Sequence, residues 1–238
     1  MKAYKNQEFI NSPEARTLRM LAEYLDPQHR LAQHGVHKAV IFWGSARIRP
    51  GLCCGPDAVD YYDAARRLAA MLAHWTSERH PAEDRYYICT GGGPGIMEAA
   101  NRGASEVNPS LSVGLNISLP HEQGANAYIS PKLNFEFHYF FMRKFWFLNL
   151  ARAQVIFPGG FGTMDELFEM LTLIQTGKKE QIPVVLFGRR FWEQLIRFDL
   201  FVEQGLIARE DLDLVHMTDD LDEAFQYLTR GLEAPAAQ

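Results

Sequence analysis

The chain has 238 residues, of which 47% are hydrophobic and 12% aromatic, and its formal net charge at pH 7 is −5. This length suits one α/β domain with a substantial core, and the apolar content excludes a disordered chain. A negative net charge excludes a global basic field that would recruit nucleic acid, so a bound anion must be held by local groups. We therefore expect a single domain over residues 1–238 that has no nucleic-acid partner.

Cysteine and histidine usage points away from disulfides and metals. Cys53, Cys54 and Cys89 are too few for a disulfide framework, and the adjacent pair lacks the spacing of a zinc knuckle. The histidines form no HExxH pattern, and neither a Walker lysine nor a G-x-S-x-G elbow is present. The chain opens without a signal-type apolar segment, and no run reaches the roughly 20 apolar residues that span a bilayer. We expect a cytoplasmic protein with no metal, no cofactor and no membrane attachment.

Residues 1–36 predict an N-terminal helical extension. Ser12 as a cap, followed by Pro13, predicts a helix start, and apolar residues then recur at helical spacing. Asp26 and Pro27 predict that a second helix begins there. We assign this extension to packing on the outside of the domain or on a partner.

From residue 38 onward, short apolar runs alternate with helical segments. This alternation predicts an α/β, Rossmann-like three-layer sandwich, with a mainly parallel sheet of about six or seven strands and helices on both faces. The core of the fold is placed at residues 38–217. The pattern indicates strands at about residues 39–43, 86–89, 112–117, 154–157, 183–187 and 213–216.

Three further segments carry local predictions. Asp57 predicts the cap of the helix after the first strand. Residues 120–131 contain few large apolar groups, which is typical either of a lid or rim or of a solvent loop without function, and the longer segment 121–137 looks like an extra loop. Residues 137–150 are dense in aromatics and predict a helix that is buried on most sides. A buried arginine needs a partner, so Arg143 in this helix must meet a core carboxylate or a bound anion.

Two strand–glycine–helix units suggest an anion site. The run 154–157 is followed by Pro158-Gly159-Gly160-Phe161-Gly162-Thr163, with helical spacing from Met164, and the run 86–89 is followed by Thr90-Gly91-Gly92-Gly93-Pro94-Gly95. Such turns offer backbone N–H groups at the positive end of a helix dipole, with no Cβ to keep an anion away. Both turns should lie at the carboxyl edge of one parallel sheet, where phosphate is the natural ligand.

Glu166 and Arg47, which lie near the predicted turns, can each have either a role in the site or a purely structural role. Glu166 falls in the first turn of its helix, where favouring the helix dipole could be its whole role. Ser45 and Arg47 follow the first strand and would form a third wall of the site. Arg47 is equally compatible with a solvated loop cation.

The segments Thr90–Met97 and Pro158–Glu166, with Met142-Arg143-Lys144 between them, resemble the LOG ("lonely guy") family of nucleoside 5'-monophosphate phosphoribohydrolases, whose signature is PGGxGTxxE. The likeness covers roughly residues 38–217, which would make this stretch a nucleotide-binding core. Family members often carry the label lysine decarboxylase, although nothing in this chain marks a pyridoxal phosphate site. The resemblance implies hydrolysis of the N-glycosidic bond of a purine nucleoside 5'-monophosphate, with AMP as the first expected substrate and a cytokinin riboside 5'-monophosphate as an analogue.

The resemblance also implies roles for residues. Glu166 would bind the ribose hydroxyls, steady an oxocarbenium-like cation and orient water, while Arg143 would position the nucleotide and assist departure of the base. The other residues implied in substrate binding are Ser45, Gly91, Gly92, Gly93, Met142, Lys144, Gly159, Gly160, Gly162 and Thr163.

Two questions stay open at this point. The chain is longer than the short LOG enzymes and is similar to AMP-nucleosidase-like relatives, which leaves base selectivity undetermined. A non-catalytic nucleotide-binding or molybdenum-cofactor-carrier protein would keep the glycine turns without needing both Arg143 and Glu166. The aromatic excess of residues 137–147, together with Leu167, Met170 and Leu171, predicts a homodimer or an assembly of dimers.

Overall fold

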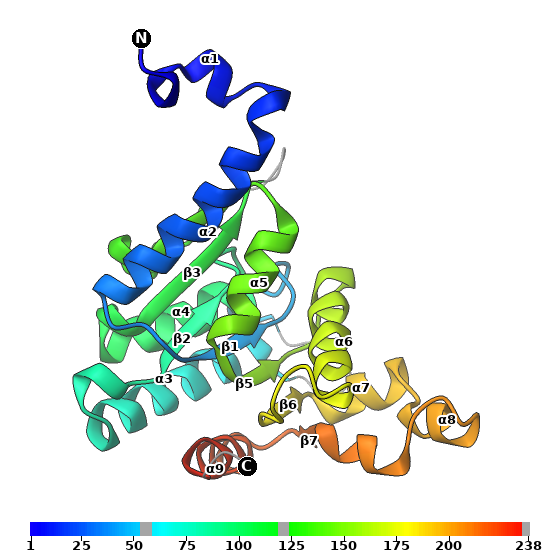
Figure 1. Ribbon diagram of the computed structural model, residues 1–238. Coiled ribbons are helices and arrows are strands. Elements are labelled where there is room, and N and C mark those ends of the chain that lie inside the picture. The colour runs from blue at the N-terminus through cyan, green and yellow to red at the C-terminus, as the bar shows by residue number, and fades with distance from the viewer. Residues whose placement is uncertain (53–58, 119–123, 235–238) are drawn as a thin grey trace.

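The computed structural model describes residues 1–52, 59–118 and 124–234. Its strands form one seven-stranded sheet in the order β4-β3-β2-β1-β5-β6-β7, and every neighbouring pair is parallel (Figure 1). The chain runs outward from β1 to β4 on one side and then places β5 to β7 on the other, which is the doubly wound arrangement. The predicted Rossmann-like α/β fold is confirmed. The strands are β1 (Ala39–Trp43), β2 (Tyr87–Thr90), β3 (Ser112–Ile117), β4 (Asn134–Phe137), β5 (Ala151–Ile156), β6 (Val184–Phe187) and β7 (His216–Thr218).

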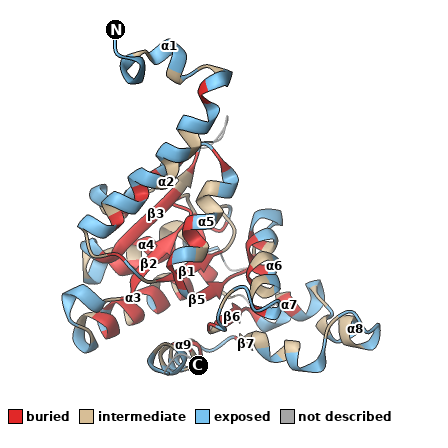
Figure 2. Cartoon of the chain, in the orientation of Figure 1, coloured by how far each residue is buried: buried red, intermediate tan, exposed pale blue. Residues whose placement is uncertain are grey.

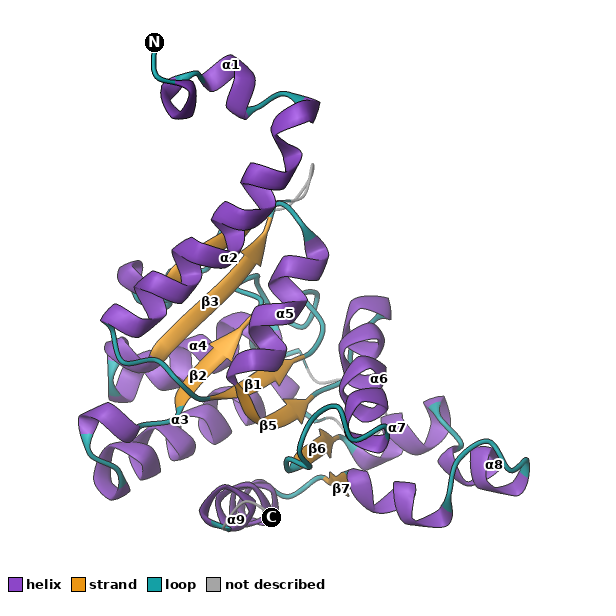
Figure 3. Cartoon of the chain, viewed as in Figure 1, coloured by secondary structure: helices purple, strands orange, loops and turns teal. Residues whose placement is uncertain are grey.

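Helices cover both faces of the sheet (Figures 1 and 3). Helices α3, α4 and α9 pack on one face, and α2 and α5 pack on the other. Every residue of β1, β2 and β6 is buried because both faces are covered, whereas the N-terminal arm is largely exposed (Figure 2). The helices are α1 (Gln7–Ile10), α2 (Arg16–Gln33), α3 (Tyr61–Arg79), α4 (Ile96–Val107), α5 (Phe140–Leu150), α6 (Phe161–Gln175), α7 (Arg189–Leu195), α8 (Phe198–Glu203) and α9 (Leu221–Glu233).

The edge strand β4 corrects the prediction of a loop over residues 121–137. Its burial alternates, with Phe135 and Phe137 facing inward and Asn134 and Glu136 exposed. Four residues are too few for this alternation to stand out from a loop in the sequence. Residues 119–123 of the expected lid lie outside the described part of the chain.

Helix α2 passes through Pro27 without ending, contrary to the predicted restart at Asp26 and Pro27. A proline inside a helix leaves the carbonyl four residues earlier without its N–H donor. That carbonyl belongs to Glu23, and it accepts a hydrogen bond from Trp146 Nε1 of α5 at 3.1 Å. The Glu23 carboxylate also accepts from the backbone N–H groups of His138 and Tyr139, just before α5. Contact with α5 therefore compensates for the proline.

Several predicted helix boundaries and burial patterns differ from the structure. The expected cap Asp57 lies outside the described residues, and α3 begins after Asp60, whose carboxylate accepts from Asp63 N. Ser12 makes no side-chain cap bond, because a 3-10 turn precedes α2. The predicted last strand, residues 213–216, is shifted to β7 because a 3-10 turn ends at Leu214. Helix α5 is less buried than predicted, with Phe140, Phe141 and Phe145 about half exposed.

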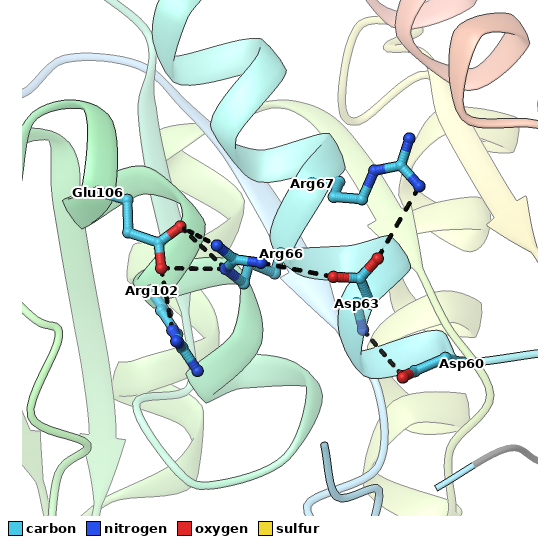
Figure 4. Close-up of polar contacts among 6 residues, drawn as sticks. All are labelled: Asp60, Asp63, Arg66, Arg67, Arg102 and Glu106. Carbon is cyan, nitrogen blue, oxygen red and sulfur yellow. Dashed lines mark hydrogen bonds and ion pairs between the residues drawn. The ribbon is translucent and has the colours of Figure 1, made fainter. Parts of the chain in front are cut away.

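Helix α4 directly follows the glycine turn after β2, and it packs closely against α3. Gly103 lies at the crossing, where a Cβ would collide with the backbone oxygen of Arg66. Around this crossing, Glu106 accepts from Arg66 and Arg102, and Arg66 also reaches Asp63 (Figure 4). These ion pairs are solvent-exposed and each contributes about 1 kcal/mol or less. The close approach at Gly103 therefore constrains the crossing of α3 and α4 more than these ion pairs do.

Candidate active site

A cleft of about 1040 Å³ opens at the carboxyl ends of β1 and β5. These two strands flank the point where the chain switches from one half of the sheet to the other. Doubly wound sheets bind ligands at such switch points. Turns after β1, β2 and β5 all contribute to the lining, through residues 44–47, through Gly91 and Gly93, and through residues 158–160.

Backbone hydrogen bonds tie the three turns together. Ser45 N donates to Pro158 O at 3.0 Å, and Ile96 N donates to Ser45 O at 3.1 Å. Gly95 has a φ of +72°, and a Cβ at this position would collide with Ser45 O. The turn after β1 is thus held between the two glycine turns, as the sequence predicted for the third wall.

The glycines at the start of α6 divide into two kinds. A Cβ on Gly159 would collide with the Thr163 side chain, so packing alone requires that glycine. A Cβ on Gly160 or Gly162 would meet no atom within 4 Å, and both residues line the cleft. The first N–H groups of an α-helix have no acceptor within the helix, and glycine leaves them accessible. The open space beside Gly160 and Gly162 therefore suits an anion.

Arg143 projects from α5 into the cleft. Its guanidinium carbon lies 5.2 Å from the ring centre of Phe140 and 5.8 Å from that of Phe147. A Cβ on Gly91 would lie 3.8 Å from Arg143 Nη1, which places the guanidinium beside the turn after β2. Aromatic faces stabilise a guanidinium through cation–π contact.

Glu166 lies on α6 behind the cleft wall, with 5% of its surface exposed. It lies in the second turn of α6 and not in the first turn that the sequence predicted, because the helix already begins at Phe161. Burial raises the pKa of Glu166 to about 7, and the charges of Lys144 and Arg143 oppose that shift. Lys144 Nζ lies 2.8 Å from Asp165 Oδ2 and 3.0 Å from Glu169 Oε2. Two cations of α5 therefore face three carboxylates of α6.

The structure brings most of the predicted site residues to the cleft, but not all of them. Those that line it are Ser45, Gly91, Gly93, Arg143, Gly159, Gly160, Gly162 and Thr163, and the weaker candidate Arg47 joins them. Those that do not line it are Gly92, Met142, Lys144 and Glu166.

The residues outside the lining have identifiable surroundings. Gly92 has a φ of +74° and approaches Asn116, so its conformation shapes the turn. Met142 packs against the core. Asn126, from the segment expected as a lid or rim, donates through its backbone N–H to Gly92 O at 2.8 Å and through Nδ2 to Gly93 O at 3.1 Å. That segment therefore braces the glycine turn.

Sequence reasoning missed one wall of the cleft and one buried donor. Arg190, Phe191, Gln194 and Leu195 of α7 line the side next to β6, and the available signal was a single glycine after that strand. Trp43, at the end of β1, also lines the cleft and is 5% exposed. Among the described residues its indole N–H has no hydrogen-bond partner. A buried donor normally has an acceptor, so a ligand atom is a natural partner for this N–H.

The described residues contain neither a cluster of metal ligands nor a membrane-spanning helix. Within the described ranges, no group of three or more His, Cys, Asp or Glu side chains could hold a metal ion. Cys89 is buried, and burial raises the pKa of its thiol. Cys53 and Cys54 lie outside the described residues. In the same ranges no helix is long and apolar enough to cross a bilayer.

Comparison with known proteins gives a family and several distant relatives. A family model described as "Possible lysine decarboxylase" matches residues 97–228. The pyrimidine/purine nucleotide 5'-monophosphate nucleosidase of Escherichia coli K12 is 30% identical over 115 residues, or 42% of this chain and 24% of that protein. The same numbers hold for the protein of that name in strain O157:H7. The matched region is thus about a quarter of the length of these curated relatives.

Two solved structures share the fold. TM1055, a structural-genomics target, aligns with a TM-score of 0.54 and 23% identity over 81% of this chain and 99% of its own. The molybdenum cofactor binding protein from the phototrophic bacterium Rippkaea orientalis aligns with a TM-score of 0.50 and 18% identity, covering 81% and 96% of the two chains. At these identities the likeness shows a common fold rather than a common activity. Because the family model covers more than half of the sequence, including the second glycine signature, the chain belongs to the "Possible lysine decarboxylase" family, which is the LOG family.

Proposed function

We propose that this protein hydrolyses the N-glycosidic bond of purine nucleoside 5'-monophosphates, with AMP as the first substrate, to give the free base and ribose 5-phosphate. The observation that carries the proposal is an open glycine cradle that Arg143 also lines, with Arg143 close enough to Glu166 for their charges to interact. The curated relatives whose printed name is a nucleotide 5'-monophosphate nucleosidase support this reaction class.

The glycine cradle is assigned to the 5'-phosphate. The open positions of Gly160 and Gly162 give a phosphate access to the backbone N–H groups at the start of α6. Arg143, on the opposite side of the cleft, is the cation that reaches the bound nucleotide. A cradle of this kind contributes only when the anion is present, so monophosphates should be preferred over nucleosides.

In the proposed reaction the bond between C1' of the ribose and the base nitrogen breaks, and its electron pair leaves with the base. The oxygen of water bonds to C1', and one proton of that water ends on the base. Positive charge develops on the ribose in between, by analogy with other glycoside hydrolysis. The negative charge of ionised Glu166 stabilises that cation, and the carboxylate is suited to orient water and accept its proton. Arg143 assists departure of the base.

The assay is a panel of nucleoside 5'-monophosphates, including AMP and a cytokinin riboside 5'-monophosphate, with free base and ribose 5-phosphate quantified. Adenosine is the matched control that lacks the phosphate. We expect kcat/KM for AMP to exceed that for adenosine by about 10² or more. Equal values would remove the phosphate assignment. Binding of AMP without any product would instead support a non-catalytic carrier.

We further propose that the chain acts as a homodimer or an assembly of dimers. Phe140, Phe141 and Phe145 of α5 are about half exposed, and Phe161 at the start of α6 is almost fully exposed. Phe140 and Phe161 also line the cleft. A second copy that covers this aromatic surface would remove apolar area from water and shield the cleft.

A further inference from the structure

Lys144 occupies a position that substrate binding does not explain. It follows Arg143 on α5, yet its side chain is absent from the lining of the cleft and only 18% exposed. Its ammonium lies between Asp165 Oδ2 and Glu169 Oε2 of the neighbouring helix α6. Because both contacts cross from one helix to the other, Lys144 connects the helix that carries Arg143 to the helix that carries Glu166.

The spacing of the acids on α6 shows why a cation is needed there. Asp165 and Glu169 are four residues apart, so they lie on one face of the helix, and like charges at this spacing repel. Glu166 lies next to Asp165 and is far more buried than either neighbour. Without a nearby cation, the two flanking carboxylates would oppose ionisation of the third.

We propose that Lys144 is a positioning residue, which ties α5 to α6 through Asp165 and Glu169 and so fixes the placement of Arg143 relative to Glu166. Its positive charge at this place also favours the ionised form of the Glu166 carboxylate. The proposal rests on the hydrolysis proposed above and adds a residue that acts through Glu166. It replaces the role in substrate binding that the family resemblance implies for Lys144.

The charges around Glu166 agree with this role. Within the described chain, the charged groups found to act on Glu166 are Lys144 and Arg143 from α5, which favour its ionised form, and Glu169 and Asp165 from α6, which oppose it. Lys144 itself stays protonated across the physiological range. Burial acts to lower the pKa of Lys144, but hydrogen bonds to Asp165 and Glu169 outweigh burial and raise it.

The test compares Lys144→Met, Lys144→Arg and Glu169→Gln through the pH profile of kcat/KM between pH 5 and 9. Methionine keeps the length of the side chain without its charge, so the acidic limb should move up by about 1 pH unit. Activity at pH 6 should then fall about tenfold more than activity at pH 8.5. Lys144→Arg should keep the wild-type limb. Glu169→Gln removes a repelling charge while Asp165 still holds Lys144, so its limb should move down.

Two results would overturn the proposal. One is a wild-type acidic limb in Lys144→Met. The other is an equal loss of activity at every pH in both Lys144 variants, which would indicate damage to the fold alone. A second measurement does not depend on turnover: the titration of Glu166 followed by carbon NMR of labelled glutamate carboxyls. If the wild type hydrolyses no nucleotide, the proposed function fails, while an upward shift of that titration in Lys144→Met still supports the positioning role.

Discussion

Replacing Glu166 by glutamine should make the protein more stable and nearly inactive. Glutamine keeps the size of the side chain but cannot ionise. Burial raises the pKa of Glu166 from 4.5 to about 7, so the folded protein holds a proton there that the unfolded chain has already lost. Each pKa unit corresponds to about 1.4 kcal/mol, so the difference between about 7 and 4.5 gives an upper value of about 3 kcal/mol.

The sign of this effect sets the pH window. Below pH 4.5 the carboxyl is protonated in both states, and it costs no stability. Between pH 4.5 and about 7 the unfolded chain ionises first, so the wild type loses stability as the pH rises, and the full penalty is present above about pH 7. Glu166→Gln lacks this penalty. Its Tm should match the wild type near pH 4.5 and exceed it by about 5–10 °C at pH 8.

Turnover should change in the opposite direction. Loss of the negative charge removes the stabilisation of the ribosyl cation, so kcat should fall by about 10² or more while AMP still binds. Differential scanning calorimetry and steady-state kinetics on one preparation measure both quantities. Glu83→Gln is a matched control, because it makes the same change at an exposed carboxylate outside the contact between α5 and α6.

A different result would indicate that Glu166 only stabilises its helix and takes no part in catalysis. If Glu166 only favoured the dipole of α6, its replacement would lower stability by no more than the about 0.3–1 kcal/mol of a first-turn acid, because Glu166 lies in the second turn, and turnover would stay nearly intact. Wild-type kcat in Glu166→Gln would therefore refute the catalytic role. A Tm that is lower than the wild type at pH 8 would refute the reasoning from burial.

Three further predictions test the cleft and the assembly. Gly162→Ala should leave the Tm unchanged or slightly higher, because its Cβ meets no other atom, yet it should raise KM for AMP about tenfold or more by filling the space for the phosphate. Gly159→Ala should lower the Tm as well, because its Cβ collides with the Thr163 side chain. An unchanged KM in Gly162→Ala would count against the phosphate site. Trp43→Phe removes the indole N–H, for which the described residues offer no acceptor, while keeping an aromatic ring. AMP affinity measured by calorimetry should then fall by about 1 kcal/mol, and wild-type affinity would mean that no ligand atom meets this donor. Light scattering at micromolar concentration should give the mass of a dimer or a multiple of it. Phe141→Glu should shift that mass toward the monomer, because it places a charge on the exposed aromatic surface. A monomeric wild type would contradict the proposed aromatic interface.

Local sequence was sufficient for the elements that depend on neighbours in the chain. Buried parallel strands such as β1 and β6 are continuous apolar runs, and the glycines after β2 and β5 mark sharp turns into helices. Parallel strands must end at one edge of the sheet, so two such turns already implied a shared site. For this reason the fold class, and the part of the cleft lining that the glycine turns form, could be predicted from residue patterns.

Tertiary structure decided what depends on partners far apart in the chain. Pro27 is tolerated in α2 because the freed carbonyl of Glu23 meets Trp146, more than 100 residues later. Lys144 is occupied by two carboxylates because the fold brings α5 and α6 within ion-pair distance, and burial moves the pKa of Glu166 toward neutrality. Dielectric environment and the distance between charges are properties of packing, and no pattern of neighbouring residues encodes them. The sequence thus determined which groups reach the carboxyl edge of the sheet, and packing alone decided which of them are charged, paired or open to a ligand.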